Sequence, residues 1–237
     1  MNDFSASLIH AAQLLGSGDP RLWEVVALSL FVSGCASAVA VPGGLVAGAW
    51  LAVTQFPGRR AVLVVLNTLL ALPSVVVGLV VYLLLSRAGP LGSLGLLFTP
   101  GAMIVAQSLL VLPIVTALAR QMIEDQMRDH GEQLLSLGAG RLRCALLLLW
   151  DERMSLVTLA LAAFGRAVSE VGAVMIVGGN IDGVTRVMTT AIALETSKGD
   201  LPLALALGFV LLGVVLILNA WIALLKEWRL RTEEAWT

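Results

Sequence analysis

The chain has 237 residues, of which 58% are hydrophobic and 13% are charged. A soluble domain usually carries about 25% charged residues, because it must cover its core with a polar surface. Lipid removes that need. The formal net charge of −1 excludes the strongly basic face that nucleic-acid binding requires. The composition therefore predicts an integral membrane protein without a nucleic-acid partner.

Five apolar segments approach or exceed the roughly 20 residues that a helix needs to cross a bilayer. They run from about Val25 to Val53, Ala61 to Leu85, Ala102 to Ala119, Met154 to Val177 and Leu203 to Leu225. Pro42, Pro73 and Pro113 should each bend a span, either for bundle packing or to line a cavity. No segment alternates with the period of two that a barrel strand requires. The predicted fold is all-α, a polytopic transmembrane helical bundle of about five spans in a single domain, residues 1–237.

The N-terminal segment Met1–Pro20 contains Asp3 and Asp19 and no basic region ahead of an apolar core. It is not expected to be a cleavable signal, so the first long apolar segment should be a retained anchor. Neither the two cysteines nor the two histidines have neighbours that indicate a disulfide or a metal site.

Basic residues are distributed unequally between the two sides of the predicted bundle. Ten lie in the connection 56–60, in the stretch 120–153 and in the C-terminal tail, whereas four lie in the opposite loops. Cytoplasmic loops carry the excess of lysine and arginine in membrane proteins. The N-terminus is therefore expected outside and the C-terminus in the cytoplasm. Trp23, Trp150 and Trp228 lie near predicted span ends, where indole rings favour the interface.

The fourth apolar segment contains two charges, Arg166 and Glu170, with Ser169 beside them. One charge at the centre of a span costs roughly 2.5–3.5 kcal/mol. The four-residue spacing places both charges on one helical face, where they can pair. Two interpretations remain open: the pair lines a pathway for a solute, or it is a structural ion pair that fixes helix packing. Asn67 and Gln107 are further polar points within spans, as pathway residues or as hydrogen-bonding residues between helices.

Glycines at 172, 178 and 179, followed by Asn180, are expected to break the fourth helix towards the outer side. The following segment, Val184–Ser197, repeats its apolar residues at helical spacing. It predicts a short amphipathic helix at the external surface that ends before Gly199.

The connection between the third and fourth spans, about residues 120–150, is long for a helix-to-helix loop. Gln121–Leu137 is predicted to be helical, with Gly138 and Gly140 as stops, and Arg141–Trp150 is predicted to form a second short helix. The first of these helices carries acidic residues that are poorly suited to contact with an anionic leaflet: Glu124, Asp125, Asp129 and Glu132. They favour docking into a groove of a partner protein over lying on lipid.

The segment Glu132–Gly138 (Glu-Gln-Leu-Leu-Ser-Leu-Gly) resembles the EAA loop of binding-protein-dependent ABC importer permeases. Leu72–Gly92 resembles the second span of the molybdate and tungstate branch, and Gly165–Asn180 and Thr185–Thr196 are similar to tungstate-type permeases. The resemblance extends over roughly Leu28 to Leu225.

Two short stretches depart from the family pattern. Gln133 and Leu134 replace the two alanines that follow the glutamate, and Leu149-Trp150 stands where leucine-proline is usual. These departures affect the contacts with an ATPase, whereas the helix end at Gly138 is retained.

The resemblance implies a non-catalytic permease subunit of a type I importer in a bacterial or archaeal inner membrane, transporting an oxyanion, with tungstate as the first choice. It implies a homodimer around one pathway, two ATPase subunits that bind ATP and magnesium, and an external solute-binding protein. The cofactors therefore belong to a partner, in agreement with the absence of a G-x-x-x-x-G-K-[ST] motif from this sequence. The residues expected to couple to the ATPase are Glu132, Leu134, Leu135, Leu137 and Gly138.

Three alternatives remain. The chain could serve another oxyanion, such as molybdate, sulfate or phosphate. An ATP-independent secondary transporter is disfavoured because no internal repeat is visible. A membrane enzyme is disfavoured because Ser169 with Glu170 is too small a catalytic set and no H-E-x-x-H motif exists.

Overall fold

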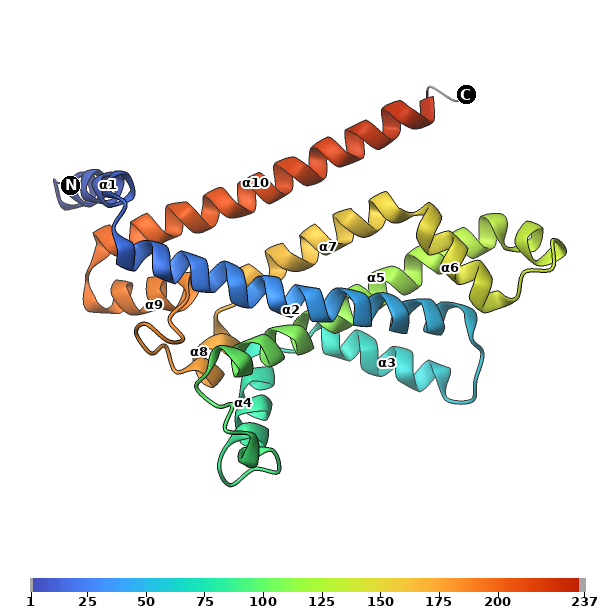
Figure 1. Ribbon diagram of the computed structural model, residues 1–237, viewed down its shortest axis with the longest axis horizontal. Helices are drawn as coiled ribbons and strands as arrows, with labels where there is room; N and C mark the ends of the chain where they lie inside the picture. Colours follow the sequence, from blue (N-terminus) through green and yellow to red (C-terminus); the bar gives the residue numbers. More distant parts are fainter. Residues whose placement is uncertain (1, 235–237) are drawn as a thin grey trace.

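The computed structural model describes residues 2–234 of the chain (Figure 1). The helices in chain order are α1 (Asn2–Ser17), α2 (Pro20–Val53), α3 (Arg59–Leu70), α4 (Ser74–Leu85), the 3-10 helix η1 (Gly92–Leu94), α5 (Pro100–Ser136), α6 (Arg141–Asp151), α7 (Arg153–Val168), α8 (Gly172–Gly178), α9 (Met188–Lys198) and α10 (Leu201–Glu234). No strand occurs within residues 2–234. The all-α prediction is confirmed.

Three helices, α2, α5 and α10, are individually long and apolar enough to cross a membrane. Two further candidate spans are broken. The chain bends by 105° between α3 and α4, and by 58° between α7 and α8. The total is up to five spans if each bent pair counts as one. This agrees with the predicted bundle of about five.

The centre of the bundle is the pair α2 and α5, which lie side by side (Figure 1). Gly44 and Gly48 of α2 allow this approach, because a Cβ atom at either position would come within 2.7 Å of an atom of α5. Small residues serve this purpose in membrane bundles, where close packing rather than apolar burial holds helices together. Buried residues of α7, α8 and α6 complete the cores around this pair.

The second apolar segment is not the single kinked helix that its sequence predicts. Helix α3 ends at Leu70, and α4 begins only after Pro73, which has an extended backbone with ψ 132°. Proline disfavours a helical conformation at the residue before it, so Leu72 cannot carry the helix across. After the 105° turn, α4 projects sideways from the bundle (Figure 1).

The fourth segment also breaks earlier than expected. Helix α7 ends at Val168, and α8 starts at Gly172. The predicted outer break is present as well, because α8 ends at Gly178 and Gly179 adopts a left-handed φ of 69°.

The two broken segments pack against each other through α4 and α8. An added Cβ atom at Gly78 would lie 2.7 Å from the Cα atom of Ala173. A Cβ atom at Gly172 would lie 2.8 Å from Oγ of Ser74 and from Cγ2 of Val75. Two glycines, one from each helix, therefore allow the break between α3 and α4 to meet the break between α7 and α8.

The connection between the third and fourth spans differs from the prediction in one respect. Residues 121–136 are not a separate helix, because they continue the third span without interruption as the second half of α5. Pro113 lies inside this helix, as Pro42 lies inside α2, and neither ends it. The predicted stop at Gly138 is confirmed by its φ of 84°, and the second short helix is α6.

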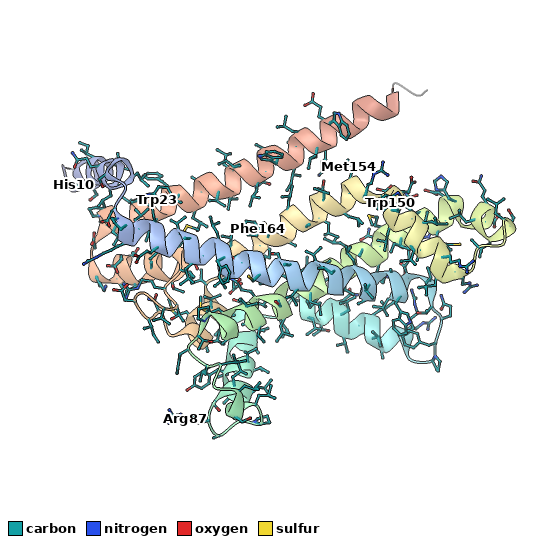
Figure 2. The ribbon with its side chains drawn as sticks, viewed as in Figure 1. His10, Trp23, Arg87, Trp150, Met154 and Phe164 are labelled. Atoms are coloured by element: carbon teal, nitrogen blue, oxygen red, sulfur yellow. The ribbon has the colours of Figure 1, made fainter. Side chains whose placement is uncertain are left out.

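At the other end of the molecule, α9 starts four residues later than the predicted amphipathic helix, because residues 181–187 form turns. Gly199 ends it with a φ of 83°, as predicted. Helices α1, α9 and α10 pack together with the start of α2. Trp23 and Trp150 lie near opposite ends of the long axis (Figure 2), and their side chains are exposed.

The close contact between α4 and α8 predicts that Gly78→Ala destabilises the protein. The added methyl group would clash with backbone atoms of Ala173, and overpacking of this kind costs about 1–3 kcal/mol. Gly34→Ala is the matched control, since a Cβ atom there meets no other atom within 4 Å. Thermal unfolding in one detergent should show a lower melting temperature for Gly78→Ala alone. An equal decrease in both variants would contradict the close contact between Gly78 and Ala173.

Candidate functional site

The Glu170 carboxylate lies at the break between α7 and α8 and is 4% exposed. Its Oε2 accepts a hydrogen bond from the Arg166 guanidinium at 2.8 Å, and its Oε1 accepts one from the Ala173 amide at 3.2 Å. The Ser74 hydroxyl at the start of α4 also hydrogen-bonds with it. The carboxylate therefore joins α7, α8 and α4 at one point.

The backbone of Glu170 is held as well. Its carbonyl oxygen accepts a hydrogen bond of 2.7 Å from the hydroxyl of Thr189, which is buried in α9. A buried carboxylate is strongly unfavourable unless it is paired and hydrogen-bonded. The contacts of the carboxylate with Arg166, Ala173 and Ser74 supply that compensation.

Arg166 and Ser169 lie at the same break but face outwards. The Arg166 side chain is 45% exposed although its guanidinium pairs with Glu170. Ser169 is exposed, and its hydroxyl donates to the Gly165 carbonyl oxygen at 2.9 Å. The i,i+4 pairing predicted from the sequence is present, with one partner buried and the other open to the surface of this chain.

Gln107 of α5 joins this group through the backbone. Its Nε2 donates a hydrogen bond of 2.9 Å to the carbonyl oxygen of Ala167, in the last turn of α7. The Gln107 side chain is buried, and its Oε1 has no hydrogen-bond partner. Gln107 therefore holds the end of α7 against α5, next to the ion pair.

Asn67 stands apart from the other predicted pathway residues. It lies on an exposed side of α3, three residues before Leu70, at which that helix ends. In the part of the chain that the structure describes, no hydrogen bond joins it to Arg166, Glu170 or Gln107.

The predicted coupling residues lie where α5 ends in a hairpin with α6. Leu134 turns inwards and packs on a core of α2, α5 and α6 residues that includes Ile123 and Leu148. Glu132 and Leu135 are exposed, and Leu137 is 83% exposed. The positive φ of Gly138 then reverses the chain into α6. One leucine therefore anchors the hairpin, and its neighbours are presented at its tip.

Ion pairs brace the hairpin against the spans. Glu124 of α5 accepts hydrogen bonds from Arg59 at 2.6 Å and from Arg120 at 2.8 and 2.9 Å. Arg59 also donates to the Leu51 carbonyl oxygen near the end of α2. The end of α2 and the start of α3 are thus attached to the second half of α5.

A second tie reaches α7. Glu152, which is 6% exposed, accepts hydrogen bonds from Gln126 of α5 at 2.7 Å and from Ser155 of α7 at 2.6 Å. Sequence reasoning did not single out Glu152, Gln126, Ser74 or Thr189. Glu152 offered a signal, as an acidic residue between two apolar helical segments, whereas the other three are ordinary polar residues that only the fold brings to these contacts.

The family of the chain follows from comparison with known proteins. The family model described as "binding-protein-dependent transport system inner membrane component" matches residues 41–230. The chain belongs to this family. The permease is 44% identical over 217 residues to the tungstate uptake system permease protein TupB of Peptoclostridium acidaminophilum, covering 92% of this chain and 95% of that protein. It is 43% identical to a probable anion ABC transporter permease of Haloferax volcanii, covering 84% and 88%.

A more distant relative is the sulfate transport system permease protein CysT of Synechocystis, 28% identical over 94% of this chain and 83% of that protein. The resemblance to ABC importer permeases is therefore confirmed, as is a multi-pass protein of the inner membrane. The relatives are permease subunits, which are non-catalytic.

The unequal burial of the ion pair predicts unequal effects of removing its partners from the permease. Arg166→Gln would leave the Glu170 carboxylate buried without its cation, which costs about 3–5 kcal/mol. Glu170→Gln would leave a half-exposed guanidinium that can reorient, at about 1–3 kcal/mol. Thermal unfolding of the two variants and of the double variant measures the difference.

The double variant should be more stable than Arg166→Gln alone, because no uncompensated charge remains. If Glu170→Gln lowers the stability more than Arg166→Gln does, burial of the carboxylate is not the main factor that determines the two effects. Transport is the second measurement: normal rates in both single variants would leave the pair with a packing role alone.

Proposed function

We propose that this permease carries tungstate into the cytoplasm, driven by ATP hydrolysis in a partner subunit. The observation that carries the proposal is the 44% identity to a tungstate uptake permease over nearly the whole of both chains. A second tungstate uptake permease, from Campylobacter jejuni, is 42% identical over 70% of this chain. The sulfate and molybdenum relatives are 28–29% identical, so tungstate is favoured over those oxyanions.

The pathway proposed for the anion passes the exposed face of Arg166, with Ser169 beside it. A half-exposed guanidinium within an apolar segment is tolerated where it faces water or protein instead of lipid. Its pairing with Glu170 leaves a nearly balanced charge, which attracts an anion weakly enough to release it. Gln107 of α5 holds this part of α7 in place through its hydrogen bond to Ala167. Asn67, on the exposed side of α3, is retained as a proposed pathway residue.

A second copy of the chain is proposed to close the pathway. Helix α4 projects from the bundle and carries a large exposed apolar surface (Figure 1), formed by Val75, Val76, Leu79, Val80, Leu83 and Leu84. Its small residue Gly78 faces α8 instead. An arm of this kind fits packing against the partner of a symmetric dimer, with Arg166 of both copies exposed towards a shared space.

The hairpin of α5 and α6 is proposed to dock into the ATPase subunit. Leu137 at its tip is 83% exposed, and Glu132 and Leu135 are exposed beside it. An apolar knob on a braced helix end is suited to a groove of a partner protein. The same orientation places the hairpin and the C-terminus in the cytoplasm, as the excess of basic residues there favours, and the N-terminus outside. A solute-binding protein would deliver the anion from that outer side.

Uptake into cells that express the permease with its ATPase and binding protein tests the substrate. We expect labelled tungstate to accumulate, and unlabelled tungstate to compete more strongly than molybdate, which should compete more strongly than sulfate. Cells with the same operon but without the permease gene are the control. Uptake of sulfate or molybdate without uptake of tungstate would contradict the proposal and assign the permease to one of those oxyanions.

Leu137→Asp should reduce co-purification of the ATPase subunit with the permease, because the apolar tip would carry a charge into the groove. Leu94→Asp is the matched control, since Leu94 is 57% exposed in the loop after α4, on the proposed outer side. The yield of the permease itself should be equal for both variants. If Leu94→Asp loses the ATPase and Leu137→Asp retains it, both the docking role and the orientation are wrong.

A further inference from the structure

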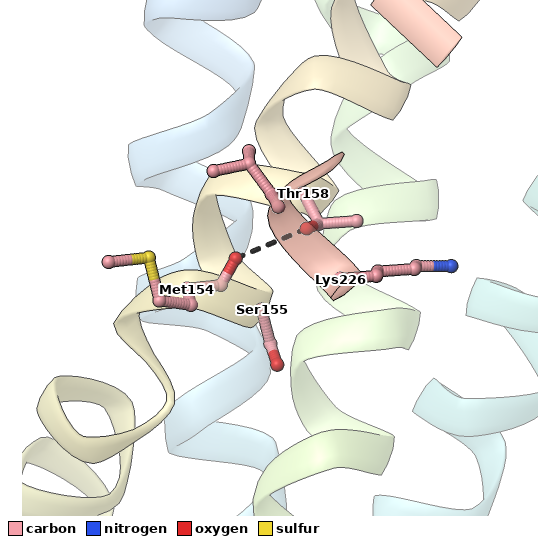
Figure 3. Close-up of a pocket in the computed structure, with 5 residues that line it drawn as sticks. Met154, Ser155, Thr158 and Lys226 are labelled. Atoms are coloured by element: carbon pink, nitrogen blue, oxygen red, sulfur yellow. Dashed lines mark hydrogen bonds between the residues drawn. The ribbon is translucent and has the colours of Figure 1, made fainter. Parts of the chain in front are cut away.

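A cleft separates α7 from the last part of α10. The two helices are in contact around Val168, and an added Cβ atom at Gly165 would lie 3.9 Å from Cδ1 of Leu218. Further along, towards the start of α7, α10 runs on beside α7 (Figure 1). Here the cleft between them has a volume of about 310 Å³ and is lined by Met154, Ser155, Thr158, Leu225 and Lys226 (Figure 3).

Two of the residues that line the cleft carry hydroxyl groups, but neither hydroxyl hydrogen is available to an occupant. The Thr158 hydroxyl donates to the Met154 carbonyl oxygen at 3.2 Å. The Ser155 hydroxyl donates to Oε2 of Glu152 at 2.6 Å. Their hydrogens are therefore used within α7 and at its start. Among the described residues that line it, the cleft offers an occupant an apolar slot and one cation, the exposed Lys226, whose side chain extends away from the α7 residues (Figure 3).

The position of Lys226 places the mouth of the cleft at the membrane surface. Leu225 is the last residue of the apolar run in α10, and Lys226 is the first charge after it. Trp150, in α6 just before α7, and Trp228, two residues after Lys226, are 74% and 54% exposed, as expected of residues at the interface. Glu227 follows Lys226 directly, but on a helix it points roughly 100° away.

We propose that this cleft binds an anionic phospholipid, with an acyl chain between α7 and α10 and its phosphate at Lys226. The slot narrows towards Gly165, where an added Cβ atom would lie 3.9 Å from Leu218, so it admits an acyl chain, whereas a helix with its side chains is about 10 Å wide. The charge of Lys226 selects an anionic headgroup over a zwitterionic one. The assignment to the cytoplasmic leaflet rests on the orientation given under the proposed function, and the binding itself does not.

The bound lipid would act as a wedge that supports the second half of α10. This helix has the smallest buried share of the three unbroken candidate spans, 17% compared with 39% for α2 and 50% for α5. Helix α10 therefore has few contacts within the described chain, and a lipid held at one fixed place would define the angle between α10 and α7.

Native mass spectrometry of the full-length permease tests the proposal, with phosphatidylglycerol and phosphatidylcholine added to the detergent in turn. We expect phosphatidylglycerol to be retained preferentially. Lys226→Ala should weaken its binding by about fivefold, equivalent to the roughly 1 kcal/mol that one lysine contributes near an anionic surface. Arg60→Ala is the matched control, because Arg60 is an exposed cation at the same end of the molecule, on α3, and should leave binding unchanged.

Thr158→Phe, which fills the slot, should reduce retention of both lipids. Unchanged phosphatidylglycerol binding in Lys226→Ala, or an equal loss in Arg60→Ala, would overturn the proposal. A photo-crosslinking residue at Leu225 gives an independent measurement in vesicles: a lipid adduct supports the site, and an adduct to a second copy or to another protein overturns it. These measurements need neither tungstate nor the ATPase, so their failure would leave the uptake experiment unaffected.

Discussion

A carboxylate buried where two broken helices meet is the constraint on which the rest of the structure depends. Glu170 is 4% exposed, and its contacts reach α7 through Arg166, α8 through the Ala173 amide and α4 through Ser74. Each break alone would leave backbone groups without partners in an apolar medium. Where the two breaks meet, the Glu170 carboxylate accepts hydrogen bonds from the Ala173 amide at the start of α8 and from the Arg166 guanidinium.

The long spans could be predicted from the sequence because their signal is local. Length and hydropathy locate α2, α5 and α10, and Gly138 and Gly199 mark helix ends through left-handed backbone conformations. The angle at Pro73 could not be predicted in this way. A proline disturbs any helix, but a turn of 105° is stable only because Gly78 lets α4 pack on Ala173 of a segment about 95 residues away.

The candidate site was predictable in its charges and less so in its geometry. The four-residue spacing of Arg166 and Glu170 indicated a pair, and the pair exists at 2.8 Å even though α7 ends between the two residues. The break itself carries no proline or glycine before Gly172, so its position depends on the contacts of Glu170. Asn67 shows the opposite case: its polarity within an apolar segment was a signal, and the fold places it away from the other candidates.

Helix α5 connects the hairpin that it forms with α6 to the ion pair in one unbroken element. Its 37 residues span roughly 55 Å at 1.5 Å per residue. Along it, Gln107 holds Ala167 of α7, Glu124 holds Arg59, and Gln126 holds Glu152 at the start of α7. Because α7 is attached to α5 near both of its ends, a force on the hairpin cannot move α5 past α7 without breaking buried hydrogen bonds. The two helices should therefore move as one body, and we expect any change of angle between the spans to occur at the joints outside this pair, at the α7–α8 break and at the α3–α4 turn.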